Sequence, residues 1–170
     1  MKTAKVQVLP HNPQWKKAFR DIENEIKTAL GGLIIGIEHV GSTSVEGIFA
    51  KPCIDIDIVI EDYNIFNEVV KKLEEIGYIY EGDLGIKGRE AFDYNDKPHL
   101  MKHHLYVCPK NSAELKRHIK FRDFLRNNPE FAQKYSEVKQ KAALLFPNDI
   151  EGYIKYKSPC IEEIYKICGL

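Results

Sequence analysis

The sequence predicts an α/β (α+β) fold: a mixed β-sheet of about five strands with helices packed on one face and a helical C-terminal third. Two observations support this fold class. Residues 54–60 alternate isoleucine with aspartate and then become wholly apolar, which is typical of a largely buried strand. Residues 15–30 and several segments after residue 111 repeat apolar side chains at helical spacing, which indicates amphipathic helices.

The predicted strands are short segments rich in β-branched and aromatic residues, each bounded by glycine, proline or asparagine. They cover about residues 33–40, 53–61, 78–81, 89–94 and 103–108. The predicted helices cover about residues 13–30, 43–50, 66–76, 112–125 and 128–145, the first of them with Pro13 at its first helical position. Pro147 interrupts the pattern, and two shorter helices are predicted after it, around Tyr153 and around residues 161–167. One domain spanning residues 1–170 is expected, helical from about residue 111.

The amino-acid composition limits the binding partners and the cellular location that are expected for this chain. Lys+Arg and Asp+Glu both number 25, and a formal net charge of zero argues against a general nucleic-acid or anionic-membrane surface. No segment is long and apolar enough to cross a bilayer, and the first residues lack the apolar stretch of a signal peptide. The four cysteines show no CxxC spacing, which indicates reduced thiols. A cytoplasmic location is expected.

Two carboxylates share one face of the strand at residues 53–61, because Asp55 and Asp57 are two positions apart. Like charges on a buried strand are costly unless a positive group compensates them. A divalent cation is the expected group, Mg²⁺ or Mn²⁺, since hard cations take carboxylate oxygens. The competing interpretation is an exposed strand end where both carboxylates are solvated.

A hydroxyl-rich turn, Gly41-Ser42-Thr43-Ser44, comes shortly before these aspartates. If it opens a helix, its backbone N–H groups and hydroxyls would contact phosphate. The competing interpretation is that Ser42 or Thr43 caps a short helix. The hydroxyl-rich turn precedes the paired aspartates within one short segment. This order favours the interpretation that the segment forms half of a metal-assisted nucleotidyl-transfer site.

A third site residue is expected from the strand at residues 103–108. Period two places His103 with the core face and His104 with Tyr106 on the opposite face. If this strand lies beside the aspartate strand, His104 faces the carboxylates as a metal ligand or general base. A solvated surface histidine is the competing interpretation. His99, in a turn, is a weaker candidate.

Several cationic side chains are available to hold phosphate oxygens. They are Lys51, Arg89, Arg117, His118, Arg122 and Lys157. For Arg117 and Arg122 a solvated helix face is the default interpretation.

The chain resembles the GrpB family of bacterial proteins, which is grouped with the DNA polymerase beta-like nucleotidyltransferases. The resemblance runs from about residue 6 to residue 167. It is carried by EHVGSTSV at 38–45, AKP at 50–52, DIDIVI at 55–60, GREAF at 88–92, HHLYVCP at 103–109 and Lys157 before IEEI at 161–164. It implies a nucleotidyltransferase-like fold in which Gly41 and Ser42 contact the triphosphate of an NTP and Asp55 and Asp57 hold Mg²⁺.

Three departures from the family pattern matter. The superfamily often has a third carboxylate on a later strand, where this chain offers His104 or Tyr106. Glu46 stands where proline is usual. Tyr106 replaces a frequent histidine, which argues against Tyr106 as a ligand.

Three functions stay open. The first is Mg²⁺-dependent transfer of NMP from an NTP to an unknown small-molecule or protein acceptor. In this function His104 would orient or deprotonate the acceptor. Phosphate would be bound by Ser42 and Ser44, and its charge would be neutralised by Lys51 and Arg89. The second is a nucleotide- or phosphate-binding accessory module without turnover, linked to coenzyme A metabolism, because some family members are fused to a dephospho-coenzyme A kinase. The third is a metal-dependent hydrolase. The sequence does not indicate the acceptor, the preferred base or the oligomeric state.

Overall fold

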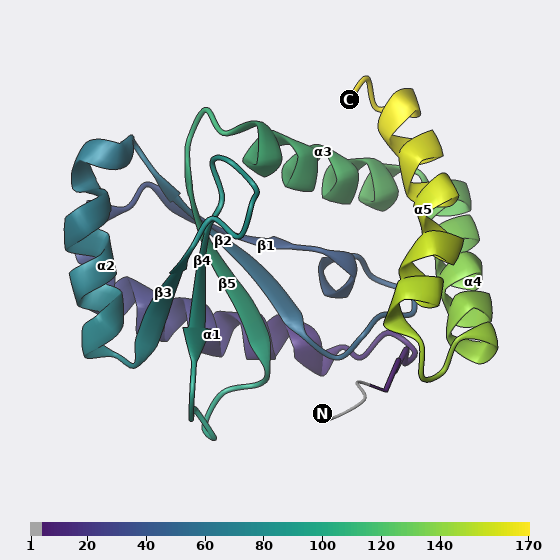
Figure 1. Cartoon of the computed structure of the whole chain (residues 1–170), viewed down its shortest axis with the longest axis horizontal. Helices are drawn as coiled ribbons and strands as arrows, with labels where there is room; N and C mark the ends of the chain where they lie inside the picture. Colours follow the sequence, from purple (N-terminus) through teal and green to yellow (C-terminus); the bar gives the residue numbers. More distant parts are fainter. Residues whose placement is uncertain (1–4) are drawn as a thin grey trace. The chain divides into compact units, whose positions relative to one another are not determined.

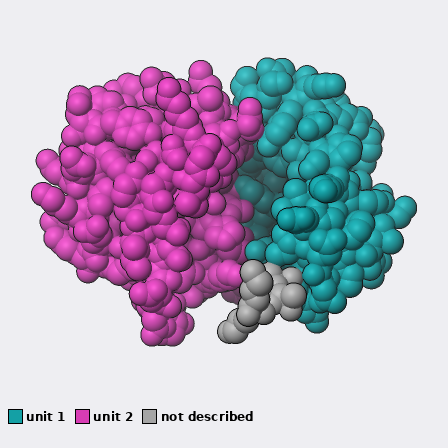
Figure 2. Space-filling model, viewed as in Figure 1, with its two compact units in different colours: residues 1–13, 41–52, 120–170 teal, residues 14–40, 53–119 magenta. Residues whose placement is uncertain are grey.

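The structure is a computed structural model that describes residues 5–170. The chain separates into two compact units, each assembled from segments that are not contiguous in sequence (Figure 2). Unit 1 contains residues 5–13, 41–52 and 120–170, and unit 2 contains residues 14–40 and 53–119. The assignment of residues 1–170 to one domain therefore stays a prediction, and its first four residues lie outside the described part.

Unit 2 contains a mixed five-stranded sheet, as predicted (Figure 1). Its strands are β1 (Gly36–Val40), β2 (Ile54–Ile60), β3 (Tyr78–Gly82), β4 (Glu90–Tyr94) and β5 (His103–Pro109). Their order across the sheet is β1-β2-β5-β4-β3. Strands β2 and β5 run parallel, and the other neighbouring pairs run antiparallel.

The isoleucines of β2 form the centre of the core. Ile54, Ile56, Ile58 and Ile60 are each 0% exposed, which confirms that this strand face is buried. Helices α1 (Gln14–Leu30) and α2 (Phe66–Glu75) supply further buried apolar side chains, and α1 passes behind the sheet in Figure 1. Burial of one isoleucine side chain stabilises the fold by roughly 1.5–3 kcal/mol.

The opposite face of β2 is covered in part by α3 (Ala113–Asn127), whose residues up to 119 belong to unit 2. Leu115 of α3 packs with Val59 and Cys108, and Ile119 lies against this cluster. Ser112 caps the helix, since its Oγ accepts the Leu115 N–H at 3.2 Å. A helix therefore approaches the face of the sheet that carries the aspartates.

Unit 1 is helical, and its two long helices pack side by side (Figure 1). They are α4 (Pro129–Leu145), with proline in its first turn, and α5 (Ile150–Ile167). The prediction of two short helices after Pro147 was wrong, because α5 continues through Pro159. Proline removes one backbone N–H from a helix and does not always end it.

The predicted helix over residues 43–50 was also wrong. The structure has a single 3-10 turn, η2 (Ser42–Ser44), after which Val45 is extended and Gly47 has φ +83°. Val45 and Ile48, three positions apart, are buried in a cluster with Leu125 and other residues of unit 1. Their spacing reflects this tertiary packing, and a left-handed glycine cannot continue an α-helix.

Cys53, Cys108, Cys160 and Cys168 are free thiols, as predicted. Within residues 5–170, no helix combines the length and the apolar character needed to cross a membrane.

An ion pair between a buried lysine and a partly exposed glutamate joins α1 to the segment between β4 and β5 in unit 2. The ammonium of Lys97, whose side chain is 4% exposed, lies 3.1 Å from Glu25 Oε2 and 4.6 Å from the centre of the Tyr78 ring. His99 Nε2 lies 2.9 Å from Glu25 Oε1. Burial raises the pKa of Glu25, but the hydrogen bonds from His99 and Lys97 outweigh burial, and the net pKa is below its usual value.

We predict that Glu25→Gln lowers the free energy of unfolding at pH 7 by roughly 1–3 kcal/mol, because it leaves the Lys97 ammonium buried without a counter-charge. A lowered carboxyl pKa contributes stability above the unfolded-state pKa, and this stability is lost as pH falls through the folded-state pKa. The difference between wild type and variant should therefore shrink below about pH 4.5. Urea unfolding followed by fluorescence of the buried Trp15 measures it.

Glu23→Gln is the matched control, since Glu23 forms an i,i+4 pair with an exposed lysine of the same helix. Its effect should stay below about 0.5 kcal/mol. Equal effects of the two substitutions would contradict the role assigned to Lys97 burial.

Candidate functional site

Several predicted site residues of unit 2 lie on one face of β2, the face that carries Asp55 and Asp57 and is called the aspartate face below. Asp55 pairs in register with His104, and Asp57 pairs with Tyr106, on the parallel strand β5. Paired residues of neighbouring strands point to the same side of a sheet, so all four side chains share one face. The prediction that His104 faces the carboxylates is confirmed.

Glu38 adds a third acid that sequence reasoning missed. It lies on β1 directly opposite Asp57 in the antiparallel register. Side chains directly opposite in such a pair have Cβ atoms about 5 Å apart, and like charges there are destabilising. Glu38 lies within the strand predicted over residues 33–40. Its position opposite Asp57 follows only from the register of β1 with β2.

Asp57 is the most deeply buried of these acids, with a side chain that is 0% exposed. His118 Nδ1–H donates to its Oδ2 at 2.6 Å. Its Oδ1 is buried and has no hydrogen-bond partner among the residues that the structure describes. Burial raises the pKa of Asp57 and outweighs the lowering by the hydrogen bond from His118. A buried carboxylate oxygen without a donor fits a site for a cation or an ordered water.

Asp55 and His104 form a second, more exposed pair. His104 Nδ1–H donates to Asp55 Oδ1 at 3.0 Å, with side chains that are 45% and 34% exposed. The hydrogen bond to Asp55, followed by one to Cys53, raises the pKa of His104 to about 10. In this arrangement Asp55 engages His104 Nδ1, and the roles of metal ligand and general base stay predictions for His104.

Arg89 reaches the same face from the start of β4. Its guanidinium lies 4.3 Å from the centre of the Tyr106 ring, and its charge lowers the pKa of Asp57. The Nε of Arg89 is buried and makes no hydrogen bond within the described part of the chain. Arg89 thus faces both the sheet acids and an aromatic platform, as expected for a residue that neutralises charge.

Gly88 places Arg89 by a close approach to α3. Ser112 Oγ donates to the Gly88 carbonyl at 2.8 Å. Gly88 has φ +81°, and a Cβ at this position would lie 3.0 Å from Ser112 Oγ. Glycine is therefore required both for the backbone conformation and for space.

The Gly-Ser turn belongs to unit 1. Gly41 has φ +73° and ψ −176°, and Ser44 Oγ donates to the Gly41 carbonyl. The Arg126 guanidinium donates twice to the Ser44 carbonyl, at 3.0 and 2.7 Å. Thr43 and Ser44 are buried, and Ser42 is half-buried beside the Tyr135 hydroxyl. The hydroxyls of Thr43 and Ser44 thus point into the protein, which leaves Gly41 and Ser42 as the more accessible part of the turn.

Two predicted lysines also lie in unit 1. Lys51 is exposed after Ala50, whose backbone pairs with Leu9. Lys157 lies within α5 with its ammonium 4.7 Å from the centre of the Tyr153 ring. Neither position is shown to meet a ligand, and both assignments stay predictions.

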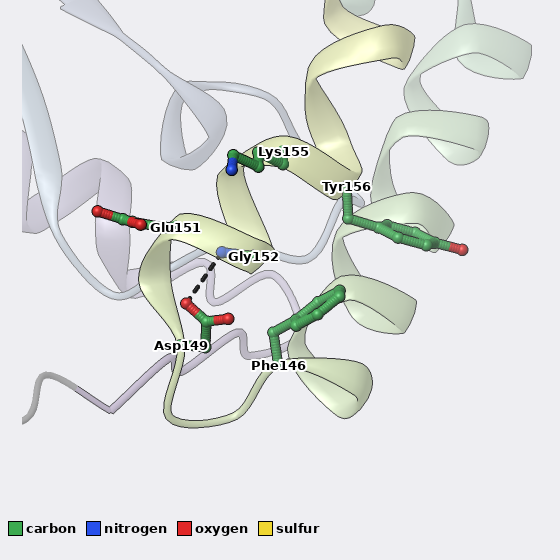
Figure 3. Close-up of a pocket in the computed structure, with 6 residues that line it drawn as sticks. All are labelled: Phe146, Asp149, Glu151, Gly152, Lys155 and Tyr156. Atoms are coloured by element: carbon green, nitrogen blue, oxygen red, sulfur yellow. Dashed lines mark hydrogen bonds between the residues drawn. The ribbon is translucent and has the colours of Figure 1, made fainter.

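A surface pocket of about 470 Å³ lies at the start of α5 (Figure 3). Asp149 caps the helix there by accepting the Gly152 N–H at 3.0 Å. The pocket is lined by Phe146, Asp149, Glu151, Gly152, Lys155 and Tyr156. None of these residues is a predicted site residue.

No group of three or more His, Cys, Asp or Glu side chains within residues 5–170 is arranged to hold a metal ion. Asp55 and Asp57 are each paired with one histidine instead, Asp55 with His104 and Asp57 with His118.

Comparison with known proteins decides the family. The model of the GrpB protein family matches residues 5–167. The chain belongs to the GrpB family. The glutamate-rich protein GrpB of Alkalihalophilus pseudofirmus is 34% identical over 164 residues, covering 94% of this chain and 93% of that protein.

Other GrpB relatives are longer. The protein YqkA of Bacillus subtilis is 31% identical over 158 residues, and this chain spans 46% of its length. A protein named dephospho-CoA kinase from Mycolicibacterium paratuberculosis is 27% identical over 186 residues, which cover 96% of this chain and 46% of the kinase.

Solved structures confirm the fold. The crystal structure of GrpB from Enterococcus faecalis matches with a TM-score of 0.80 at 30% identity, covering 96% of this chain and all of that one. The Cid1 poly(U) polymerase, solved with MgGTP bound, matches with a TM-score of 0.56 at 10% identity, covering 79% of this chain and 44% of Cid1. The GrpB chain therefore has a nucleotidyltransferase-like fold, as its resemblance implied.

We predict that Gly88→Ala destabilises unit 2 by roughly 1–3 kcal/mol, because it combines a left-handed alanine with a contact against Ser112. Gly85→Ala is the matched control, since Gly85 has a similar φ of +86° and open space around its Cβ position. Urea unfolding should show the larger loss for Gly88→Ala. Equal losses would show that the approach of Gly88 to Ser112 contributes nothing.

Proposed function

We propose that this chain is a divalent-cation-dependent nucleotidyltransferase that moves NMP from an NTP to an acceptor. The observation that carries the proposal is Asp57, a buried carboxylate on the same strand face as Asp55, whose Oδ1 accepts no hydrogen bond in the described residues. The nucleotidyltransferase-like fold supports the same assignment.

Asp55 and Asp57 are the proposed metal ligands, with Mg²⁺ or Mn²⁺ as the ion. When bound, the ion would offset the charge that develops on phosphate oxygens. The chain's own contribution is to hold both carboxylates on one strand face and to neutralise them in its absence through His104 and His118. His104, which is hydrogen-bonded to Asp55, is proposed as a further metal ligand or as the group that orients or deprotonates the acceptor.

The phosphate contacts are proposed to come from Gly41 and Ser42, with Arg89 neutralising charge. The support for the turn is its rigidity within unit 1, since Arg126 fixes the Ser44 carbonyl through two hydrogen bonds. Backbone N–H groups of a fixed turn bind anions without a further ordering cost. Lys51 and Lys157 are proposed to add positive charge for the same nucleotide, and Thr43 and Ser44 are proposed to contact its phosphates through the turn.

A second function is favoured by one specific observation. Both aspartates are already paired with histidines, which offset the carboxylate charge from within the chain, as expected of a module that binds nucleotide without turning it over. The similarity to a protein named dephospho-CoA kinase supports an accessory role in coenzyme A metabolism as this alternative.

We predict that the chain binds an NTP in the presence of Mn²⁺ and that Asp57→Asn weakens this binding by more than about 100-fold, since even residues that only support ligands cost 10- to 100-fold. Calorimetry with ATP, GTP, CTP and UTP, each with Mn²⁺, measures it. Asp21→Asn, at an exposed position of α1, is the control and should bind as wild type does. The proposal fails if no triphosphate binds, or if Asp57→Asn binds unchanged.

Pyrophosphate release separates the two functions. With a bound NTP and Mn²⁺, the nucleotidyltransferase releases pyrophosphate when an acceptor from a metabolite and protein panel is supplied. Binding without release across that panel would favour the accessory module. Release with water as the only acceptor would identify a hydrolase instead.

A further inference from the structure

His118 on α3 is hydrogen-bonded to Asp57, a contact that its position in the sequence does not predict. Its Nδ1 lies 2.6 Å from Asp57 Oδ2, and its Nε2 lies 3.6 Å from Glu114 Oε2. His118 and Glu114 are four residues apart on α3 and therefore share a helix face. All three residues belong to unit 2.

The surroundings of His118 hold its ring in one orientation. Its side chain is 21% exposed and that of Glu114 is 17% exposed. Glu114 is itself fixed by Arg117 Nη1, which donates to Glu114 Oε1 at 2.8 Å. The first turn of α3 is held in turn by Ser112, whose hydroxyl bonds both the Leu115 N–H and the Gly88 carbonyl. The imidazole therefore has a carboxylate at each nitrogen.

The bond to His118 also decides which oxygen of Asp57 is available. Because Oδ2 is engaged at 2.6 Å, rotation of the carboxylate is restricted and Oδ1 is left directed elsewhere. Oδ1 is buried without a donor from any residue in the range 5–170. A purely structural ion pair at a fully buried position is stable only when the remaining lone pairs also find partners. A carboxylate with one oxygen hydrogen-bonded and the other without a donor is instead the arrangement expected of a metal ligand held by a supporting residue.

We propose that His118 is a positioning residue: supported by Glu114, it holds Asp57 through Oδ2 so that Oδ1 is presented to a divalent cation. This inference rests on the proposed function, since it assumes that Asp57 is a metal ligand. His118 touches neither the ion nor the substrate and acts only through Asp57.

The test is the affinity of the full-length chain for Mn²⁺ alone, measured by the loss of the electron paramagnetic resonance signal of the free ion. His118→Leu removes the donor and should weaken binding by about 10- to 100-fold. His118→Asn keeps an N–H donor near the position of Nδ1 and should recover most of that affinity. His99→Leu is the matched control, because His99 also bonds a carboxylate in unit 2, and its affinity should equal that of wild type.

Thermal melts of each variant separate positioning from folding. A merely structural role would lower the melting temperature of His118→Leu while leaving the Mn²⁺ affinity of the folded chain unchanged, and that result overturns the inference. Equal weakening in His118→Leu and His118→Asn also overturns it. If His118→Leu does not fold, Glu114→Gln replaces it, and an unchanged affinity in that variant overturns the inference. If wild type does not bind Mn²⁺, both the proposed function and the inference about His118 fail. If wild type binds Mn²⁺ and the variants give one of the contrary results above, only the inference about His118 fails.

Discussion

The placement of acidic side chains on one face of β2 is the constraint on which the rest of unit 2 depends. The strand's other face consists of fully buried isoleucines, so its backbone cannot turn to expose the acids without removing four apolar side chains from the core. Removing them from the core would cost several kcal/mol. Asp55 and Asp57 are therefore held on one face, and each must be compensated there.

Compensation comes from the neighbouring strand β5 and from helix α3, which covers part of this face. His104 arrives from the parallel strand β5 and pairs with Asp55, while His118 arrives from α3 and pairs with Asp57. Arg89 supplies further positive charge beside Asp57. The compensation is incomplete at Asp57, where one buried oxygen receives no hydrogen bond from the described chain. Natural proteins commonly leave such incomplete satisfaction at functional sites rather than in structural cores.

The sheet and most of the site could be predicted because both follow from period-two patterns. Alternation in β2 alone placed Asp55 and Asp57 together, and alternation in β5 placed His104 with them. The position of Glu38 depends on strand register, and that of His118 depends on how α3 packs on the sheet. Neither is encoded in local spacing.

The wrong predictions share a different cause. Val45 and Ile48 are three positions apart, as the apolar residues of a helix would be. Both side chains instead pack in the core of unit 1 from a segment that is not helical. Gly47, with a positive φ, shows that the backbone there is irregular. Short apolar spacings are ambiguous between these possibilities, whereas long periodic segments such as α1 and α4 are not.

The most direct measurement is anomalous diffraction from crystals soaked with Mn²⁺ and a non-hydrolysable NTP analogue. The proposed function predicts an anomalous peak about 2.1 Å from Asp57 Oδ1, shared with a carboxylate oxygen of Asp55 and with phosphate oxygens. It is contradicted if nucleotide density appears while Asp57 stays hydrogen-bonded only to protein and no peak lies beside it.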